Sequence, residues 1–265
     1  QFDNKLIKKI SSLVGSRNFK KINALDLELG MIYRDLAIDF LGSKKVDLIS
    51  THGQTLRHQD CVESLQIGHP KYLSLHFNVP IIYNFRPKDI LLGGTGAPFV
   101  PYLDWLIFKE SKKNVITINL GGISNITYIP CSGNRKDVVG FDTGPGMCYI
   151  DEFVKHYIED SYDINAIYSQ RGIVDDILLN ELLKNKFVNL EPPKSTTRED
   201  FSKRKLLKIA AKYKHLNKFD FLRTLVKFTA DSISLNINNY IGKDLYDKIY
   251  ISGGGAKHKI LVEDL

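Results

Sequence analysis

Three short glycine-rich segments are the residues of this sequence best suited to binding an anion. Gly121-Gly122, Gly144-Pro145-Gly146 and Gly253-Gly254-Gly255 each follow an apolar run that is typical of a β-strand. Glycine lacks a Cβ atom, so its backbone N–H groups can approach a phosphate closely, and a helix that starts after such a turn points its N-terminus at the anion. One turn alone is weak evidence, because hairpins also use glycine. The three together favour nucleotide binding, although none fits GxxxxGK[ST] or GxGxxG.

Asp142 is the carboxylate best placed for acid–base chemistry. It ends the apolar run 138–142 and enters the Gly-Pro-Gly turn. A general base has to lie within hydrogen-bond distance of the proton it removes, and a strand end on rigid backbone provides such fixed placement. The structural alternative is a turn aspartate that accepts hydrogen bonds from its own backbone. The residues alone leave both interpretations open.

Polar and basic side chains near these turns are candidates for holding a ligand. His52 and Gln54 follow the apolar run 46–50 in HGQT and could orient a ligand or a water, or belong to a structured loop. Several basic residues could attract an acidic substrate, with an ordinary surface charge as the alternative for each: Arg57, Arg86, Lys88, Lys194 and Arg198.

The elements that position these residues alternate between strand-like and helix-like patterns, which is typical of an α/β or mixed fold. Apolar periodicity predicts helices over 25–41, 100–108, 148–157, 203–218 and 221–240, and strands over 46–50, 80–83, 115–119, 123–130, 138–142 and 249–252. Gly121-Gly122 lies between two strands, which predicts a hairpin. The polar stretch 110–114 predicts a boundary between domains at 1–112 and 113–265.

Composition excludes several other classes of protein. The net charge of +7 over 265 residues is compatible with nucleic-acid binding, but lysine is abundant along the whole chain, so we expect no nucleic-acid partner. Cys61, Cys131 and Cys148 lie far apart and form no CxxC pair, so we predict free thiols and no protein metal site. Without a membrane-spanning stretch or a secretory segment, we expect a cytoplasmic protein with no membrane partner.

Seven stretches resemble the anhydro-N-acetylmuramic acid kinase family. They occur in the family's order and cover nearly the whole chain: STHGQTLRH (50–58), LQIGHP (65–70), FRPKDILLGGTGAPFVP (85–101), INLGGISNIT (118–127), GFDTGPGM (140–147), PPKSTTREDF (192–201) and SGGGA (252–256). The segments INLGGISN, GFDTGPG and GGTGAP together make the resemblance highly specific.

The resemblance implies a fold of the actin, Hsp70 and hexokinase type, with two RNase H-like α/β domains and ATP in the cleft between them. It implies phosphoryl transfer from Mg-ATP to the 6-hydroxyl of 1,6-anhydro-N-acetylmuramic acid, coupled to hydrolytic opening of the anhydro ring. The product is N-acetylmuramic acid 6-phosphate, in peptidoglycan recycling. ATP and Mg²⁺ are therefore the expected cofactors, and a homodimer is expected by family analogy.

The resemblance also assigns roles to residues. Asp142 matches the family's catalytic base, which would deprotonate the attacking water. The predicted nucleotide-binding residues are Gly121, Gly122 and Asn125 in a phosphate-binding hairpin and Gly253, Gly254 and Gly255 in an adenosine-side loop. The predicted substrate-binding residues are His52, Gln54, Arg86, Gly144 and Lys194.

The sequence departs from the family's pattern in ways that keep two alternatives open. It lacks the usual GTSxDG segment and ends before the second acidic residue and the closing helices, so we expect a chain that is incomplete at both ends. Asn84, Met147, Asn165-Ala166 and His258 stand where the family usually has Asp, Asn, Asp-Gly and Asn. A degenerate, non-catalytic remnant is therefore one alternative. An RNase H-like nucleic-acid-binding protein or nuclease is the other, although a two-metal site would need several converging carboxylates.

Overall fold

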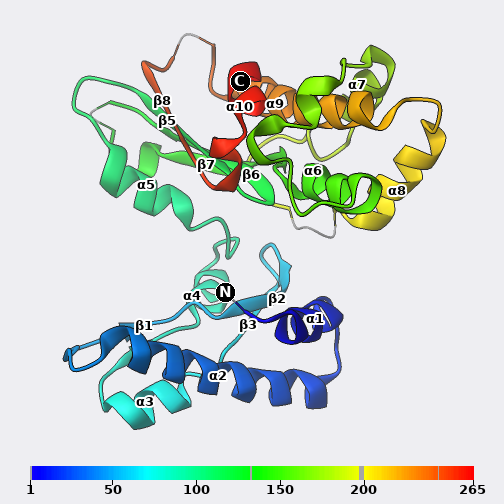
Figure 1. Cartoon of the computed structure of the whole chain (residues 1–265). Helices are drawn as coiled ribbons and strands as arrows, with labels where there is room; N and C mark the ends of the chain where they lie inside the picture. The colour runs from blue at the N-terminus through cyan, green and yellow to red at the C-terminus, as the bar shows by residue number, and fades with distance from the viewer. Residues whose placement is uncertain (1, 132, 197–199, 244) are drawn as a thin grey trace. The chain divides into compact units, whose positions relative to one another are not determined.

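The computed structural model describes residues 2–131, 133–196, 200–243 and 245–265. Helices and strands are mixed along the chain, so the α/β class predicted from the sequence is confirmed (Figure 1). The chain divides into a first compact unit that ends at Ala97 and a second unit, Pro98–Leu265. The assignment of two RNase H-like domains is finer than this division and stays a prediction.

The first unit packs helices against short strands. Its elements are α1 (Asn4–Leu13), α2 (Phe19–Leu41), β1 (Ile49–Ser50), β2 (Gln54–Gln59), β3 (Glu63–Ile67), α3 (Lys71–Phe77), β4 (Ile81–Ile82) and α4 (Phe85–Leu91). β1 pairs in parallel with β4, and β2 pairs antiparallel with β3. Buried apolar residues of α1 and α2 meet Leu56 and Ile67 of the β2–β3 hairpin in a small core.

Local capping explains why α2 is longer than predicted. The helix begins at Phe19 rather than near residue 25, because the Asn18 side chain accepts a hydrogen bond from the Lys21 N–H at 3.2 Å. The predicted strands 46–50 and 80–83 are shorter than expected and survive only as β1 and β4.

The second unit carries the larger sheet and most of the helices. Its elements are α5 (Val100–Phe108), β5 (Val115–Leu120), β6 (Ile123–Ile129), β7 (Val139–Pro145), α6 (Cys148–Phe153), α7 (Asp176–Leu183), α8 (Lys203–Lys212), α9 (Lys218–Tyr240), β8 (Lys248–Ser252) and α10 (Lys259–Asp264). Shorter helical turns are Arg135–Asp137, Val154–Ile158, Ile164–Ala166, Ser169–Arg171 and Gly254–Lys257.

The sheet of this unit has the strand order β7–β6–β5–β8. β5, β6 and β7 are successive antiparallel neighbours, and the β5–β6 pairing confirms the hairpin predicted at Gly121-Gly122. β8 returns after a long connection and pairs in parallel with β5, with Asn119 opposite Ser252. The turn after β5 and the turn after β8 therefore lie at the same edge of the sheet.

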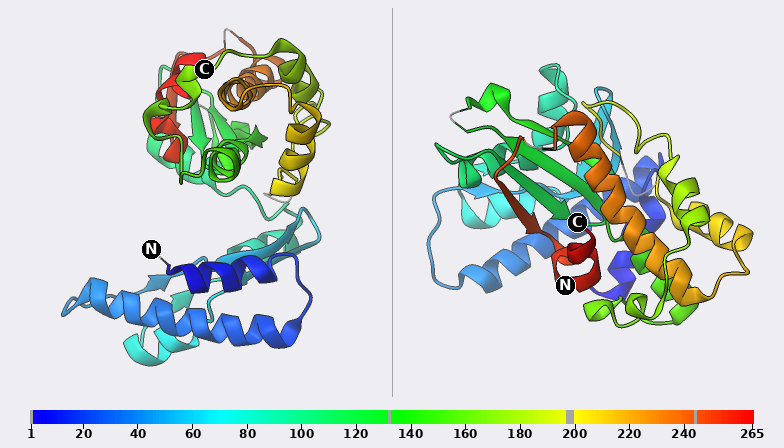
Figure 2. Two further views of the ribbon diagram at one scale, coloured as in Figure 1. Left: turned by 45° about the vertical axis from the view of Figure 1, so that its right-hand side comes forward. Right: turned by 90° about the horizontal axis from the view of Figure 1, so that it is seen from above.

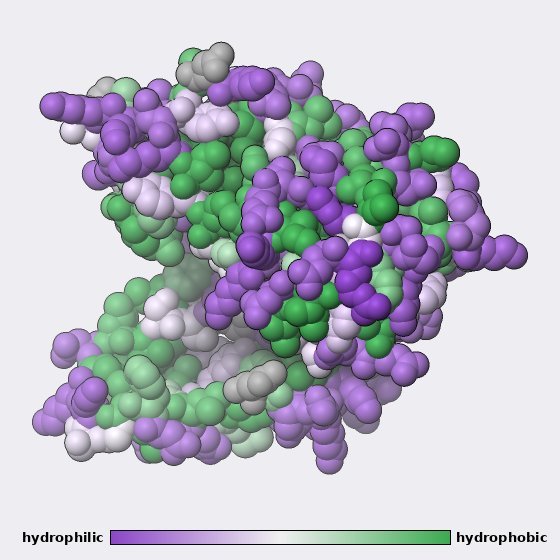
Figure 3. Space-filling view, turned by 45° about the horizontal axis from the view of Figure 1, so that its top comes forward, coloured by the Kyte–Doolittle hydropathy of each residue, from purple (hydrophilic) through white to green (hydrophobic). Residues whose placement is uncertain are grey.

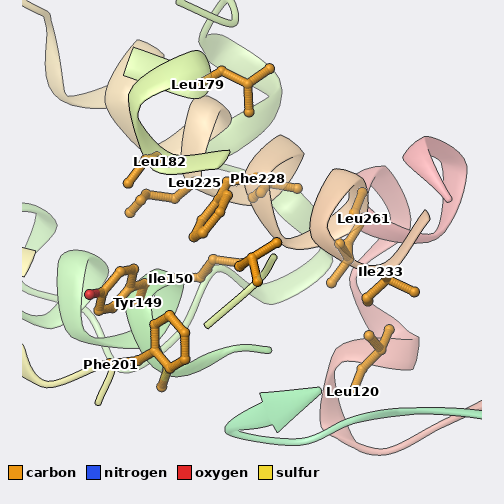
Figure 4. Packing of buried hydrophobic residues seen from close by; sticks show 14 of the residues in the cluster. Leu120, Tyr149, Ile150, Leu179, Leu182, Phe201, Leu225, Phe228, Ile233 and Leu261 are labelled. Carbon is orange, nitrogen blue, oxygen red and sulfur yellow. The ribbon is translucent and has the colours of Figure 1, made fainter. Parts of the chain in front are cut away.

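α9 forms the centre of the hydrophobic core. It lies along one face of the sheet (Figure 2) and buries residues through most of its length, including Leu222, Leu225 and Phe228. Each large apolar side chain buried in this way stabilises the fold by about 1.5–3 kcal/mol. Leu120 at the end of β5 lies in the same cluster as Ile233 of α9 and Leu261 of α10 (Figure 4). The core thus extends directly beneath the glycine-containing turns.

α5 belongs to the second unit. The Asp104 carboxylate on this helix accepts hydrogen bonds from the hydroxyls of Thr117 on β5, at 2.5 Å, and Thr127 on β6, at 2.9 Å. The compact units consequently divide before α5, whereas the predicted domain boundary lies after it, at 112/113.

Figure 3 shows hydrophobic areas between hydrophilic ones on one view of the surface. α5 exposes several apolar residues: Tyr102, Leu103, Leu106 and Ile107.

Within the described part of the chain, none of the helices combines the length and the apolarity that crossing a bilayer requires. The same residues contain no cluster of three or more His, Cys, Asp or Glu side chains arranged to hold a metal ion.

Candidate functional site

The Gly121-Gly122 turn is held by the start of α6. The N–H groups of Gly146 and Cys148 donate to the Gly122 carbonyl at 3.0 and 3.1 Å, and the Met147 N–H donates to the Gly121 carbonyl at 2.8 Å. A Cβ atom at Gly146 would lie 2.3 Å from the Gly121 oxygen, so only glycine allows this approach. We expected the amides of the Gly144-Pro145-Gly146 turn to approach an anion, but the Gly146 N–H supports the Gly121-Gly122 hairpin instead.

The glycine triplet follows β8 at the same edge of the sheet. Gly253 has φ +86°, and a Cβ atom there would lie 2.7 Å from the Asn119 side-chain oxygen and from the Leu120 backbone. The chain then turns through Gly254–Lys257 into α10. Gly253 thus lets the turn pass close against the end of β5.

The two turns share a pocket of about 470 Å³. Gly121 and Gly122 contribute from the hairpin, and Gly254 contributes from the triplet. The other described residues that line it are Leu120, Met147, Asp151, Tyr162, Asp163, Ile164, Asn165, Lys257 and His258. Gly253, Gly255, Asn125 and Asp142 are not among the described residues on its wall. The structure therefore brings together three of the predicted nucleotide-binding glycines.

Asp142 lies on β7, opposite Asn125 of β6 in the strand register. Its side chain is buried, and its Oδ2 accepts a hydrogen bond from the Thr196 N–H at 2.8 Å. The Asp142 N–H donates to the Lys194 carbonyl at 3.1 Å. The PPKSTTREDF segment, of which residues 197–199 lie outside the described part of the chain, thus contacts Asp142 twice, once at its carboxylate and once at its backbone N–H. Gly144, two residues further along β7, is buried opposite Ser124.

Lys194 directs its ammonium group into the protein. The Nζ donates to the carbonyls of Phe187, at 3.1 Å, and Val188, at 2.9 Å, and the residue is only 6% exposed. The aromatic rings of Phe141, Phe187 and Tyr240 surround it. Burial lowers the pKa of this lysine to about 8, although the nearby Asp142 charge opposes the shift. The side chain predicted to bind substrate therefore braces the 187–194 segment in this structure.

Three predicted substrate-binding residues lie in the first unit, and two of them are joined. The Arg86 Nε donates to His52 Nε2 at 2.7 Å, and one Arg86 terminal nitrogen donates to the Gly96 carbonyl at 2.9 Å. Since Nε2 accepts, His52 carries its proton on Nδ1, which donates to the Gly53 carbonyl at 2.9 Å. Gln54 begins β2 and donates to the Thr55 carbonyl at 3.3 Å.

A buried Asp163–His258 pair forms part of the pocket wall, and the sequence prediction did not include it. His258 Nε2 lies 3.0 Å from Asp163 Oδ2, and both residues are 3% exposed. Asp163 also accepts from the Tyr168 N–H at 2.8 Å and the Ser169 N–H at 3.1 Å. Burial alone would raise the pKa of Asp163, but the hydrogen bonds outweigh it and hold the pKa below its usual value. No local sequence signal could reveal this pair, because its members lie far apart in the chain.

A family model described as anhydro-N-acetylmuramic acid kinase matches residues 3–265. The chain belongs to this family. Its members are sugar kinases, which are phosphotransferases, and the resemblance drawn from the motifs is therefore confirmed.

Curated relatives support the same assignment. The anhydro-N-acetylmuramic acid kinase of Clostridioides difficile (strain 630) is 41% identical over 224 residues, covering 82% of this chain and 58% of that protein. The Bacillus cereus (strain G9842) kinase is 33% identical, covering 94% and 69%. The Shewanella frigidimarina (strain NCIMB 400) kinase is 36% identical, covering 92% and 67%. The chain thus spans 58% to 69% of the length of these relatives.

Among solved structures, a ROK family protein from Streptococcus pneumoniae TIGR4 in complex with sucrose has a TM-score of 0.32 and 10% identity, covering 88% of this chain and 72% of that chain.

Three of the residues that the resemblance marks as departures from the family's pattern, Met147, Asn165 and His258, line the pocket, whereas Asn84 lies in the first unit. Asn165 and the buried Ala166 both have left-handed backbone, with φ of 54° and 60°. By the resemblance drawn from the sequence, Ala166 takes the place of a glycine, and a left-handed alanine is strained by roughly 1–2 kcal/mol. The turn therefore keeps the backbone conformation that glycine favours.

Proposed function

We propose that this chain carries out ATP-dependent phosphorylation of 1,6-anhydro-N-acetylmuramic acid, with hydrolytic opening of the anhydro ring, to give N-acetylmuramic acid 6-phosphate. Family membership supports the substrate class. The observation that carries the proposal is the pocket in which glycines from two different strand ends, Gly121-Gly122 and Gly254, face the same space. The reaction would serve peptidoglycan recycling, and cytoplasmic placement and a homodimer remain predictions.

The residues of the pocket fit a nucleotide. Around Gly254 an added Cβ atom would meet nothing within 4 Å, so a ligand can approach this backbone closely. In the proposed arrangement Gly121 and Gly122, supported by Asn125 on β6, lie at the phosphates, and the 253–255 turn lies on the adenosine side. Mg²⁺ commonly keeps several waters and binds through phosphates and one or two carboxylates. It would thus be carried with ATP, because the described residues offer no protein cage for it.

Asp142 is the proposed general base. It would take a proton from a water whose oxygen bonds to the anomeric carbon, while the bond from that carbon to the bridging oxygen breaks. The freed oxygen at position 6 would then attack the γ-phosphorus of ATP, and ADP would leave. The hydrogen bond from the Thr196 N–H supports this role, because it fixes the carboxylate in one orientation. His52, Gln54, Arg86 and Gly144 remain the candidates for holding the sugar, and Lys194 remains one on the condition that its ammonium group releases the Phe187 and Val188 carbonyls.

A phosphorylation assay with Mg-ATP and 1,6-anhydro-N-acetylmuramic acid tests the proposal. We expect formation of the 6-phosphate by the wild-type chain and a loss of at least about 100-fold in kcat for Asp142→Asn, because a positioned base contributes about 10²–10⁴-fold. Asp176→Asn, at an exposed position in the first turn of α7, is the matched control and should keep full activity. Full activity of Asp142→Asn would contradict the assignment of the base. A wild-type chain that folds but neither binds nor uses ATP would favour the non-catalytic remnant.

A further inference from the structure

The pocket has a wall that the glycine turns do not provide. Tyr162, Asp163, Ile164 and Asn165 form this wall, which we call the 162–165 loop. The loop lies far in sequence from the 253–258 turn that it faces across the pocket. Its position relative to that turn consequently depends on tertiary contacts.

The Asp163–His258 hydrogen bond, at 3.0 Å, joins the two segments, and the Ser169 hydroxyl lies 3.5 Å from the same His258 Nε2. Asp163 anchors its own segment, because its two carboxylate oxygens accept from the N–H groups of Tyr168 and Ser169. His258 anchors the other, because its Nδ1 accepts from the Leu261 N–H at 3.2 Å and caps the start of α10. Since Nδ1 accepts, the proton is on Nε2, which donates to Asp163 Oδ2. One imidazole thus links the helix cap to the loop.

A second anchor of α10 lies away from the pocket and provides a comparison. The Arg223 guanidinium on α9 makes two hydrogen bonds to the Asp264 carboxylate, at 2.6 and 2.9 Å. Neither residue is among those described on the pocket wall. The Arg223–Asp264 pair therefore fastens the same helix from a position off the pocket wall.

We propose that the His258–Asp163 hydrogen bond is a positioning device that fixes the 253–258 turn against the 162–165 loop and so sets the affinity of the pocket for its nucleotide. The inference rests on the proposed function for the identity of the ligand. The hydrogen bond that joins the two segments does not depend on which ligand the pocket binds. A buried hydrogen bond to a charged group suits this role, because leaving the buried carboxylate unpaired would cost free energy. That cost favours the one arrangement of the two segments in which the bond is made.

The test uses the whole chain and four variants. His258→Asn keeps a side-chain oxygen that can cap α10, because asparagine is a favourable N-cap residue, but it is too short to reach Asp163. His258→Gln keeps a side-chain N–H donor, and glutamine extends further toward Asp163 than asparagine does. Asp163→Asn removes the carboxylate. Arg223→Gln breaks the other anchor of α10 and is the control for a general loss of stability.

Calorimetric titration with Mg-ATP is the first readout. We expect His258→Asn and Asp163→Asn to weaken binding about ten-fold or more, the effect of losing one charged hydrogen bond. His258→Gln should recover part of this loss. Arg223→Gln should lower the melting temperature and leave the affinity within about two-fold of wild type, since distant sites act independently. Equal losses of affinity in His258→Asn and Arg223→Gln would overturn the proposal, because stability alone would then explain both.

Hydrogen exchange without nucleotide separates this inference from the proposed function. We expect His258→Asn to speed exchange in both 162–169 and 253–262, and Arg223→Gln to speed it in α10 but not in 162–169. If the rate of hydrogen exchange in 162–169 is the same in His258→Asn as in the wild type, the pair does not position the loop. If the wild-type chain binds no Mg-ATP, the proposed function and the affinity claim fail together, and the exchange result still decides whether the pair positions the loop.

Discussion

Gly253 shows how one residue can determine the shape of the site. Its φ of +86° lies in a region that side chains with a Cβ atom rarely adopt, and the space where that Cβ would lie is filled by Asn119 and Leu120. Backbone strain and steric overlap therefore act together at this position. The neighbouring Gly254 is exposed and has open space around it.

We expect Gly253→Ala to lower the free energy of unfolding by about 2–4 kcal/mol, from left-handed strain and overpacking combined. Gly254→Ala should change it by no more than about 0.5 kcal/mol, as surface substitutions usually do. Urea denaturation followed by circular dichroism measures both. Equal effects of the two substitutions would show that the close approach of Gly253 to β5 is not a constraint.

Lys194 gives the molecule a pH dependence in the alkaline range. Burial lowers its pKa from 10.5 to about 8 in the folded chain. Below pH 8 both the folded and unfolded chains hold the proton. Between about 8 and 10.5 the unfolded chain binds more protons than the folded chain, so the contribution of this residue to stability rises with pH.

The comparison of wild type with Lys194→Met isolates this titration. We expect the difference in unfolding free energy, wild type minus variant, to be constant below pH 8 and to rise from about pH 8 toward 10.5. Lys208→Met, at an exposed position on α8, is the control and should give a flat difference. A flat profile for Lys194→Met, or a falling one, would contradict the effect of burial on this lysine.

At the scale of elements, one carboxylate of α5 makes hydrogen bonds to two strands of the sheet. Asp104 accepts hydrogen bonds from Thr117 and Thr127, whose side chains lie on adjacent strands and are buried. Each hydroxyl would lose its acceptor if the carboxylate were removed. A buried polar group left unpaired costs about 1–3 kcal/mol.

Asp104→Ala should therefore destabilise the fold by about 2–4 kcal/mol. The same substitution in a Thr117→Val, Thr127→Val background should cost much less, since the hydroxyls that lose their acceptor are then absent. Thermal unfolding of the four chains completes the double-mutant cycle. Equal costs of Asp104→Ala in both backgrounds would show that the two hydrogen bonds do not attach α5.

At the scale of the whole molecule, the two compact units have separate cores of different size. The core of the second unit includes residues from β5, β6, β7 and most of the helices around α9. The first unit buries a smaller set around α1, α2 and the β2–β3 hairpin. The proposed nucleotide pocket lies entirely within the second unit. Its geometry thus depends on the larger core.

The sequence by itself determined the α/β class, the hairpin at Gly121-Gly122, helix α5 and the family. These depend on local periodicity, on turn residues and on motifs that are contiguous in the chain. It also indicated Gly121, Gly122 and Gly254, because strand ends followed by glycine have a recognisable local pattern.

Only the tertiary structure decided which of these residues share a pocket and what completes its wall. The register of β5 with β8 places the two glycine turns at one edge of the sheet, and the burial of Asp163 with His258 joins segments that are distant in sequence. The tertiary structure also directs the Lys194 ammonium group toward the carbonyls of Phe187 and Val188. Such contacts follow from how helices and strands pack together. They cannot be predicted from the sequence, because no short-range pattern of residues encodes them.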